Sequence, residues 1–441
     1  MVNNSKYFLF FLLFSVLVSC TSSKNQIVIN TPSVEEILTL GGGFNESATS
    51  VVAFYDGGYA VVGFSQSIDG DVQTSKTEVQ YDFWVLRFNS EGVLIHQNVY
   101  GGTADDKAYK AIATNDNGLV VVGYSESADG DVFNNQGLKD VWVLKLDNEG
   151  VIQWQTNTGF TGVDSGYSLI QTSDGGYFIG GILDVTASQG EGNQRLSARH
   201  AGGDYWGLKL DATGNIEWRR YFGGSNTDTC YDVVEANDGY ILVGSSDSTD
   251  VDISNNLGSY DFWVVKVDKS GSLLWEKSFG GDEIDEARGI VNTNDGNFII
   301  VGDTRSSNQD ITHNNGAADC WIVKINTNGE ILWEKSFGGS SFDAARSITK
   351  TQDGGYLIAG SSRSLDNGFI NQGQNDAWLL KIDKEGDEEW QKTIGGSNVD
   401  ILYDAIALEN ENIIAVGESL SNDGDVLINK GFSDLLIIKL K

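Results

Sequence analysis

Short apolar stretches recur along the whole chain and are separated by turn-forming residues. Within residues 338–394 this pattern predicts four strands, at 343–351, 356–360, 376–381 and 389–394. Asp353-Gly354-Gly355, between the first two strands, is typical of a tight hairpin turn, and Asp383 to Gly386 of a second turn. The unit is therefore predicted to be a small antiparallel sheet.

The same unit occurs seven times, with a period of about 57–64 residues. Each copy begins at a glycine-rich step, at Gly42-Gly43, Gly101-Gly102, Gly159, Gly223-Gly224, Gly280-Gly281, Gly338-Gly339 or Gly395-Gly396. The seventh copy ends after its third strand, at 435–440, and residues 35–40 match the missing fourth strand. Open strand edges pair with other chains, so a ring of such units must close.

We therefore predict an all-β fold, a seven-bladed β-propeller of four-stranded antiparallel blades over residues 35–441. The N-terminal strand completes the last blade. An open solenoid or an eight-bladed ring is the alternative.

All eleven Trp residues fall on the third or fourth strand of a blade, which favours core packing over a sugar-stacking platform. A basic residue follows three positions after each third-strand Trp, and we interpret these residues as surface charges or snorkelling side chains.

The repeat contains the motifs Trp-x-x-x-Phe-Gly-Gly-x-x-x-Asp, Asp-Gly-Gly-Tyr-x-x-x-Gly-Ser and Asp-x-Trp-x-x-Lys. It resembles the bacterial seven-bladed propeller repeats of secreted and surface proteins over essentially the whole mature chain. The segment of Asp147, Gly150 and Trp154 is also similar to repeats of quinoprotein dehydrogenases and of eight-bladed outer-membrane assembly lipoproteins. The resemblance implies an architecture and no shared activity, because propellers host many functions.

Residues 1–19 have the features of a secretory signal peptide, with Lys6 ahead of an apolar run at 7–18. Leu17-Val18-Ser19-Cys20 resembles the bacterial lipobox, which implies that Cys20 is lipidated; an ordinary signal peptide is the alternative. Residues 20–34 read as a flexible tether. We expect a cell-envelope protein held at the membrane only by its lipid anchor, and Thr21 favours the outer membrane by family analogy.

Composition restricts the function. The chain has 62 acidic and 29 basic side chains, for a net charge of −33, which argues against nucleic-acid binding. Three Cys cannot form a disulfide framework, and Cys230 and Cys320 are predicted to be buried thiols. The three His occupy unrelated repeat positions, and the sequence contains no hydrolase, zinc or nucleotide motif. We therefore favour a monomeric, non-enzymatic propeller that binds a protein or carbohydrate. A polysaccharide hydrolase or lyase and an envelope assembly factor are the alternatives.

Two sets of carboxylates recur in every blade, on the same face as the long loops between second and third strands. The first-ring carboxylates follow the glycine steps: Glu46, Asp106, Asp164, Asp228, Asp285, Asp343 and Asp400. The second-ring carboxylates precede the third strands: Asp82, Asp140, Asp204, Asp261, Asp319, Asp376 and Asp434. They either cap backbone N–H groups or, in the first ring, contribute to a binding face.

The long loops supply two further candidates. Asp69, Asp71, Asp129, Asp131, Asp423 and Asp425 are oxygen ligands of the kind that Ca²⁺ prefers, although their spacing lacks the full EF-hand pattern. No other cofactor is expected. The loop at 183–203 is longer than its counterparts and contains Arg195, Arg199 and His200, which indicates either a specific contact or a tolerated insertion.

Overall fold

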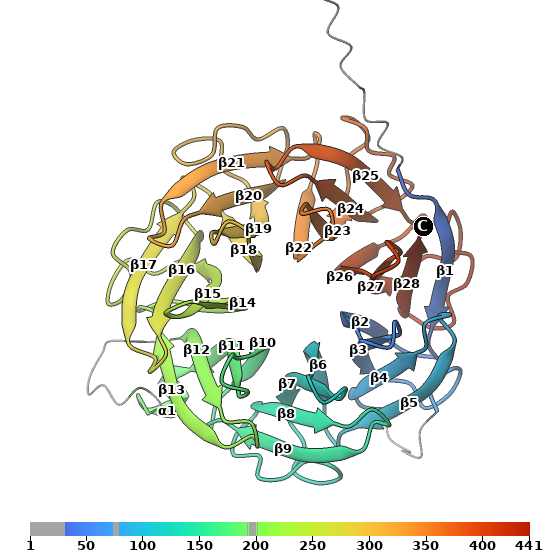
Figure 1. Cartoon of the computed structure of the whole chain (residues 1–441), viewed down its shortest axis with the longest axis horizontal. Helices are drawn as coiled ribbons and strands as arrows, with labels where there is room; N and C mark the ends of the chain where they lie inside the picture. Colours follow the sequence, from blue (N-terminus) through green and yellow to red (C-terminus); the bar gives the residue numbers. More distant parts are fainter. Residues whose placement is uncertain (1–30, 74–78, 192, 194–199, 201) are drawn as a thin grey trace, which may run out of the picture. The chain divides into compact units, whose positions relative to one another are not determined.

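Seven antiparallel sheets, each of four strands, are arranged in a ring (Figure 1). The structure, a computed structural model, describes residues 31–441 except 74–78, 192, 194–199 and 201. Thr31–Lys441 form one compact unit. The predicted all-β, seven-bladed propeller is thus confirmed.

Each blade runs from an inner strand beside the central axis to an outer strand at the rim. The inner strands are β2 (Glu46–Ala53), β6 (Asp106–Ala113), β10 (Ser165–Gln171), β14 (Asp228–Ala236), β18 (Asp285–Asn292), β22 (Asp343–Lys350) and β26 (Asp400–Ala407). The second strands are β3 (Tyr59–Ser65), β7 (Leu119–Ser125), β11 (Tyr177–Asp184), β15 (Gly239–Ser246), β19 (Phe298–Thr304), β23 (Tyr356–Ser362) and β27 (Ile413–Ser419).

The outer half of each blade follows the same order. The third strands are β4 (Asp82–Phe88), β8 (Asp140–Leu146), β12 (Gly203–Leu210), β16 (Asp261–Asp268), β20 (Asp319–Ile325), β24 (Asp376–Ile382) and β28 (Asp434–Leu440). The outer strands are β5 (Leu94–Tyr100), β9 (Ile152–Thr158), β13 (Ile216–Phe222), β17 (Leu273–Phe279), β21 (Ile331–Phe337), β25 (Glu388–Ile394) and β1 (Val34–Leu40). One short helix, α1 (Val185–Ser188), lies in the loop after β11. In the part of the chain that the structure covers, no helix has the length and apolar character needed to cross a membrane.

The two ends of the chain meet in the seventh blade. Strand β1 pairs with β28 in an antiparallel ladder, in which Ile37 lies opposite Ile438 and Leu40 opposite Leu435. The Ser33 N–H donates to the Lys441 carbonyl oxygen at 2.9 Å, so the pairing continues to the last residue. The ring is closed by the N-terminal strand as predicted, because the edge of β28 would otherwise be unpaired.

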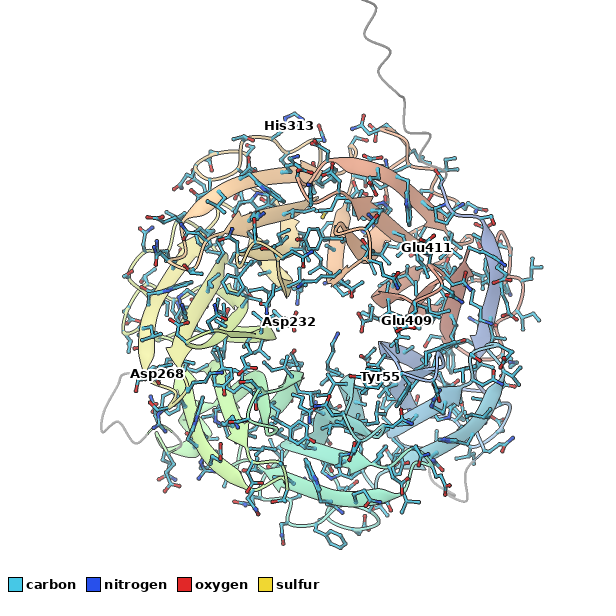
Figure 2. The ribbon with its side chains drawn as sticks, in the orientation of Figure 1. Tyr55, Asp232, Asp268, His313, Glu409 and Glu411 are labelled. Carbon is cyan, nitrogen blue, oxygen red and sulfur yellow. The ribbon has the colours of Figure 1, made fainter. Side chains whose placement is uncertain are left out.

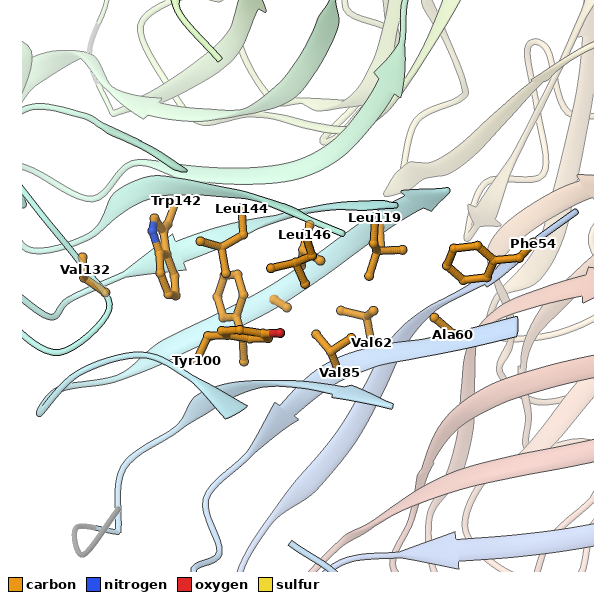
Figure 3. Packing of buried hydrophobic residues seen from close by; sticks show 14 residues of the cluster. Phe54, Ala60, Val62, Val85, Tyr100, Leu119, Val132, Trp142, Leu144 and Leu146 are labelled. Carbon is orange, nitrogen blue, oxygen red and sulfur yellow. The ribbon is translucent and has the colours of Figure 1, made fainter. Parts of the chain in front are cut away.

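The core lies between neighbouring blades and is apolar on both sides of the third strands. Figure 3 shows Trp142 and Leu144 of one blade packed against Val85 and Tyr100 of the preceding blade. The third-strand Trp side chains are at most 1% exposed, namely Trp84, Trp142, Trp206, Trp263, Trp321 and Trp378. Their assignment to the core is confirmed, since each blade covers the next and leaves no free sheet face.

The third-strand basic residues, by contrast, are not surface charges. Lys145 is 5% exposed and its Nζ lies 2.9 Å from Asp116 Oδ1, in the turn between the first two strands of the same blade. Arg87, Lys209, Lys266, Lys324 and Lys381 make the equivalent pairs with Asp56, Asp174, Asp238, Asp295 and Asp353. The stems are buried and the charged ends reach aspartates that are more than half exposed, so the snorkelling alternative holds and the surface-charge alternative does not.

Candidate functional site

Every inner strand contains a β-bulge at the same position. In the second blade Ala108 pairs with Gly123 and Lys110 with Val122, so Tyr109 has no partner in β7. The equivalent extra residues, here called the bulge ring, are Thr49, Tyr109, Tyr167, Tyr231, Arg288, Arg346 and Tyr403. A bulge bends its strand and changes the direction of a side chain, and such features often lie next to functional sites.

A glycine in the second strand makes this bulge possible. A Cβ at Gly123 would lie 1.9 Å from the Lys107 carbonyl oxygen, and one at Gly360 would lie 1.9 Å from that of Ala344. The other five blades have glycine at the same place: Gly63, Gly181, Gly244, Gly302 and Gly417. The recurring Gly of the second strand is therefore required by the close approach of the two backbones.

All seven members of the bulge ring line a cavity of about 320 Å³, here called the channel cavity. Lys110, Asp232 and Phe64 also line it. Figure 2 shows Asp232 at the inner edge of the ring, beside the central axis. The circular array thus brings side chains from all seven blades, separated by nearly the whole chain in sequence, to one place.

Three tyrosines from consecutive blades and two arginines from the next two blades follow one another around the channel cavity. The rings of Tyr109, Tyr167 and Tyr231 form a continuous arc, with centroids 5.0 Å apart for the first pair and 5.7 Å for the second. The arc ends where the Arg288 guanidinium carbon lies 4.1 Å from the Tyr231 centroid. Arg346 follows in the next blade.

A layer of charged side chains adjoins these rings. Lys110 Nζ is 3.0 Å from Asp404 Oδ2, which also accepts a hydrogen bond from Ser50 at 3.1 Å. Burial opposes the charge on Lys110, but the carboxylates of Asp404 and Asp232 outweigh it and raise the pKa of Lys110. Lys110 also lines a second cavity of about 520 Å³, so this layer lies where the two cavities adjoin.

The sequence interpretation did not include the bulge ring, although a signal was present. Three residues after the first-ring carboxylate, six of the seven copies have Tyr or Arg, and the preceding residue is mostly small. A large polar residue in an otherwise buried inner strand indicates that it faces a cavity. Strand pairing was needed to recognise it, since simple alternation does not predict a bulge.

The first-ring carboxylates lie elsewhere, at the start of the inner strands, and all seven are 0% exposed. Asp343 shows the common arrangement, in which its Oδ2 accepts hydrogen bonds from the Gly339 N–H and the Ser364 hydroxyl, each at 2.7 Å. In the second ring, Asp376 Oδ2 accepts from the Gln372 N–H at 2.8 Å. Both rings therefore hold the glycine turns and the long loops in place.

Burial makes the second-ring carboxylates harder to ionise. It raises the pKa of Asp261 to about 7, and the nearby charges of Asp285 and Asp310 act in the same direction. The hydrogen bond from the Leu257 N–H acts in the opposite direction. Burial likewise raises the pKa values of Asp140, Asp319 and Asp376 to about 6. The ordinary pKa of an Asp side chain is 3.8. Because folding raises this pKa, the protonated form of each group stabilises the folded state.

The pKa values predict that the protein melts at a higher temperature at pH 5 than at pH 8. A group whose pKa is raised by folding stabilises the fold fully below its unfolded value near 3.8, and this contribution is lost as pH rises through the folded value of about 6–7. Aspartates with lowered pKa values, such as Asp116 at about 2, act in the opposite direction only at lower pH. Thermal unfolding followed by circular dichroism between pH 5 and pH 8 measures the difference.

A matched pair of variants separates this effect from general charge repulsion. Asp261→Asn keeps an acceptor for the Leu257 N–H and should reduce the change in melting temperature with pH. Glu409→Gln removes the same charge from an exposed turn and should leave the pH dependence unchanged. A melting temperature that rises from pH 5 to pH 8 would contradict the prediction.

The candidate calcium ligands also accept backbone hydrogen bonds. Asp71 and Asp131 accept from Gly41 and Gly101 at 3.1 Å, and Asp425 accepts from Gly395 at 3.2 Å. Asp69, Asp129 and Asp423 accept from Gly43, Thr103 and Ser397. Within residues 31–441, apart from the segments left out of the description, no three His, Cys, Asp or Glu side chains are grouped to hold a metal. Calcium binding stays a prediction.

The candidates in the long loop of the third blade are only partly described. Arg195 and Arg199 lie outside the described residues, as does the predicted lipidation site Cys20. The His200 side chain is 2% exposed, and its Nδ1 pairs with Asp204 Oδ2. In the second blade the same second-ring oxygen accepts the Gln136 N–H, so an imidazole replaces a backbone donor here.

No protein-family model matches the chain. The regulatory protein FlaEY of Caulobacter vibrioides is 22% identical over 404 residues, which cover 82% of this chain and 41% of that protein. The chain thus spans less than half the length of this curated relative. Among solved structures, the WD40 β-propeller domain of Doa1 is 12% identical with a TM-score of 0.52, and the alignment covers 93% of this chain and 96% of that one.

The WD40 domain of Pan2 from Neurospora crassa aligns over 92% of this chain and 96% of its own, at 9% identity and a TM-score of 0.47. Identity this low tells nothing about activity. Together with the strand order, the likeness to the Doa1 domain shows that the chain has a seven-bladed β-propeller fold.

Proposed function

We propose that this chain is a binding protein of the cell envelope, which uses the loop face of its propeller to bind a protein partner. The observation that carries the proposal is a group of exposed apolar side chains on the second-to-third loops of two neighbouring blades. Their exposed fractions are 75% and 74% for Leu365 and Ile370, and 76%, 60% and 66% for Leu427, Ile428 and Phe432. We call these five residues the loop patch.

Exposed apolar groups with a polar rim are typical of protein–protein interfaces. The loop patch lies among acidic residues such as Asp366 and Asp423, so a partner with an apolar centre and a basic rim fits it. Phe133 and Leu138, on the corresponding loop of the second blade, are 61% and 65% exposed and extend the same character around the face. In the fourth and fifth blades, the described loops contain only Val251 among large exposed apolar residues.

The cell-envelope role rests on the signal sequence and on the lipobox-like Leu-Val-Ser-Cys. An anchored propeller with a surface for another protein agrees with a binding role rather than with catalysis. The curated relative is described as a regulatory protein, and regulation commonly acts through binding.

Capture from a membrane-enriched extract with the purified, immobilised protein tests the proposal. The triple variant Leu427→Ser, Ile428→Ser, Phe432→Ser is expected to lose a partner that the wild type retains, because the apolar centre of the interface is removed. Val93→Ser with Ile95→Ser is the matched control. These side chains are 58% and 54% exposed, and they lie just before and within the outer strand β5.

The control should retain the partner. A partner held equally by the wild type and both variants would contradict the use of the loop patch. Unchanged melting temperatures of both variants are needed to show that the fold is intact.

A further inference from the structure

The wall of the channel cavity differs in charge from the rest of the protein. Its charged side chains are three cations, Lys110, Arg288 and Arg346, and one anion, Asp232. The chain as a whole has 62 acidic and 29 basic residues. Asp404 pairs with Lys110 and Glu286 with Arg288, so among the described residues Arg346 is the lining cation that keeps an unpaired charge. An unpaired cation in the wall of a cavity favours an anionic ligand.

The two arginines retain donors that the protein does not use. The Nε atoms of Arg288 and Arg346 are both buried without a hydrogen-bond partner. Glu286 lies 2.9 Å from an Nη of Arg288. The buried Asp303 interacts electrostatically with both arginines, but Arg346 forms no ion pair among the described residues. A buried, unpaired donor is unfavourable, and a guanidinium satisfies its donors best with a carboxylate, which can accept two parallel bonds.

The tyrosine arc supplies the other half of a binding site. Tyr109, Tyr167 and Tyr231 come from the second, third and fourth blades, while Arg288 and Arg346 come from the fifth and sixth. Aromatic faces pack against flat aromatic rings and against the apolar faces of sugar rings. The volume of about 320 Å³ is at the small end of the range for ligand pockets and suits a molecule of one or two rings.

We propose that the channel cavity binds a small carboxylate with a ring-shaped body, with the carboxylate at Arg346 and Arg288 and the ring against the tyrosine arc. Such a ligand is either a sugar acid or an aromatic acid. The site is separate from the loop patch, so each proposal can fail without the other.

Calorimetric titration of the purified protein with two matched pairs of probes tests this proposal. D-glucuronate is compared with D-glucuronamide, and benzoate with benzamide, because each amide keeps the ring and loses the charge. We expect saturable binding of at least one acid, with its amide weaker by about tenfold or more. The pair that binds identifies the ligand source as sugar or aromatic.

Arg346→Gln should weaken binding of that acid by about tenfold or more, since it removes the charged donor. Arg305→Gln is the control, because this exposed arginine is not among the residues that line the cavity. Binding of neither acid, equal binding of acid and amide, or equal losses in the two variants would each overturn the proposal. If Arg346→Gln does not fold, the comparison of acid and amide on the wild type decides.

Discussion

A chain that lacks residues 33–40 is expected to lose its cooperative fold and to self-associate. Strand β1 supplies the whole outer edge of the seventh blade, and Leu38 and Leu40 pack against the core between that blade and the first. Loss of its ladder hydrogen bonds, at about 1 kcal/mol each, and of its apolar contacts destabilises the fold by on the order of 5 kcal/mol or more. That is comparable with the total stability of many domains.

The deletion also leaves β28 as an unpaired edge whose backbone donors and acceptors invite pairing with another chain. Thermal unfolding and sedimentation over a range of protein concentrations measure the two consequences. Glu35→Ala, at an exposed position of the same strand, should leave both unchanged. A peptide with the sequence of residues 33–40, added in excess, should restore part of the stability; a deleted chain that stays monomeric with the wild-type melting temperature would refute the prediction.

Trp378→Ala is expected to lower the free energy of unfolding by about 3–5 kcal/mol. Trp378 is 0% exposed, its ring lies 5.2 Å from that of Phe369, and its Nε1 donates to Gln391 Oε1 at 3.1 Å. Truncation removes this packing and leaves a cavity between two blades that the rigid sheets cannot close. Equilibrium denaturation by guanidinium measures the loss.

Trp333→Ala is the matched control for this prediction. Trp333 lies on an outer strand and is only partly buried, covered by the turn at Gly386 of the next blade. Its removal should cost less, because part of its surface already faces water. Equal losses in the two variants would contradict the assignment of the third-strand Trp residues as the centre of the core.

The fold was predictable because each feature is repeated. The glycine steps, the hairpin turns and the two Trp positions recur from blade to blade, so an error in one copy is corrected by the others. The N-terminal strand was predictable because the last copy lacks its fourth strand, and β1 pairs with β28 as expected. The third-strand basic residues were interpreted as surface charges or snorkelling side chains. The choice between the two needed the structure, because the hairpin turn that holds the partner is about 29 residues away in sequence.

The channel cavity was not predicted for a different reason. Tyr167 and Arg346 belong to blades that do not adjoin, and only closure of the ring brings them to one cavity. Their direction also depends on the bulge, which displaces them from the alternation of a regular strand. A position that is constant across the repeats can be recognised from the sequence. The bulge-ring position varies between Thr, Tyr and Arg, and the repeat pattern therefore does not reveal it.

The amino-acid sequence by itself determined the number of blades, the closure by the N-terminal strand and the place of the tryptophans in the core. These follow from local patterns, repeated along the chain and constrained by the need to pair every edge. Only the tertiary structure decided which polar side chains are buried and which meet at the channel. Asp343 is 0% exposed, and Arg346 lines the same cavity as the tyrosine arc. Both features depend on contacts between distant segments, and such contacts exist only when the ring has closed.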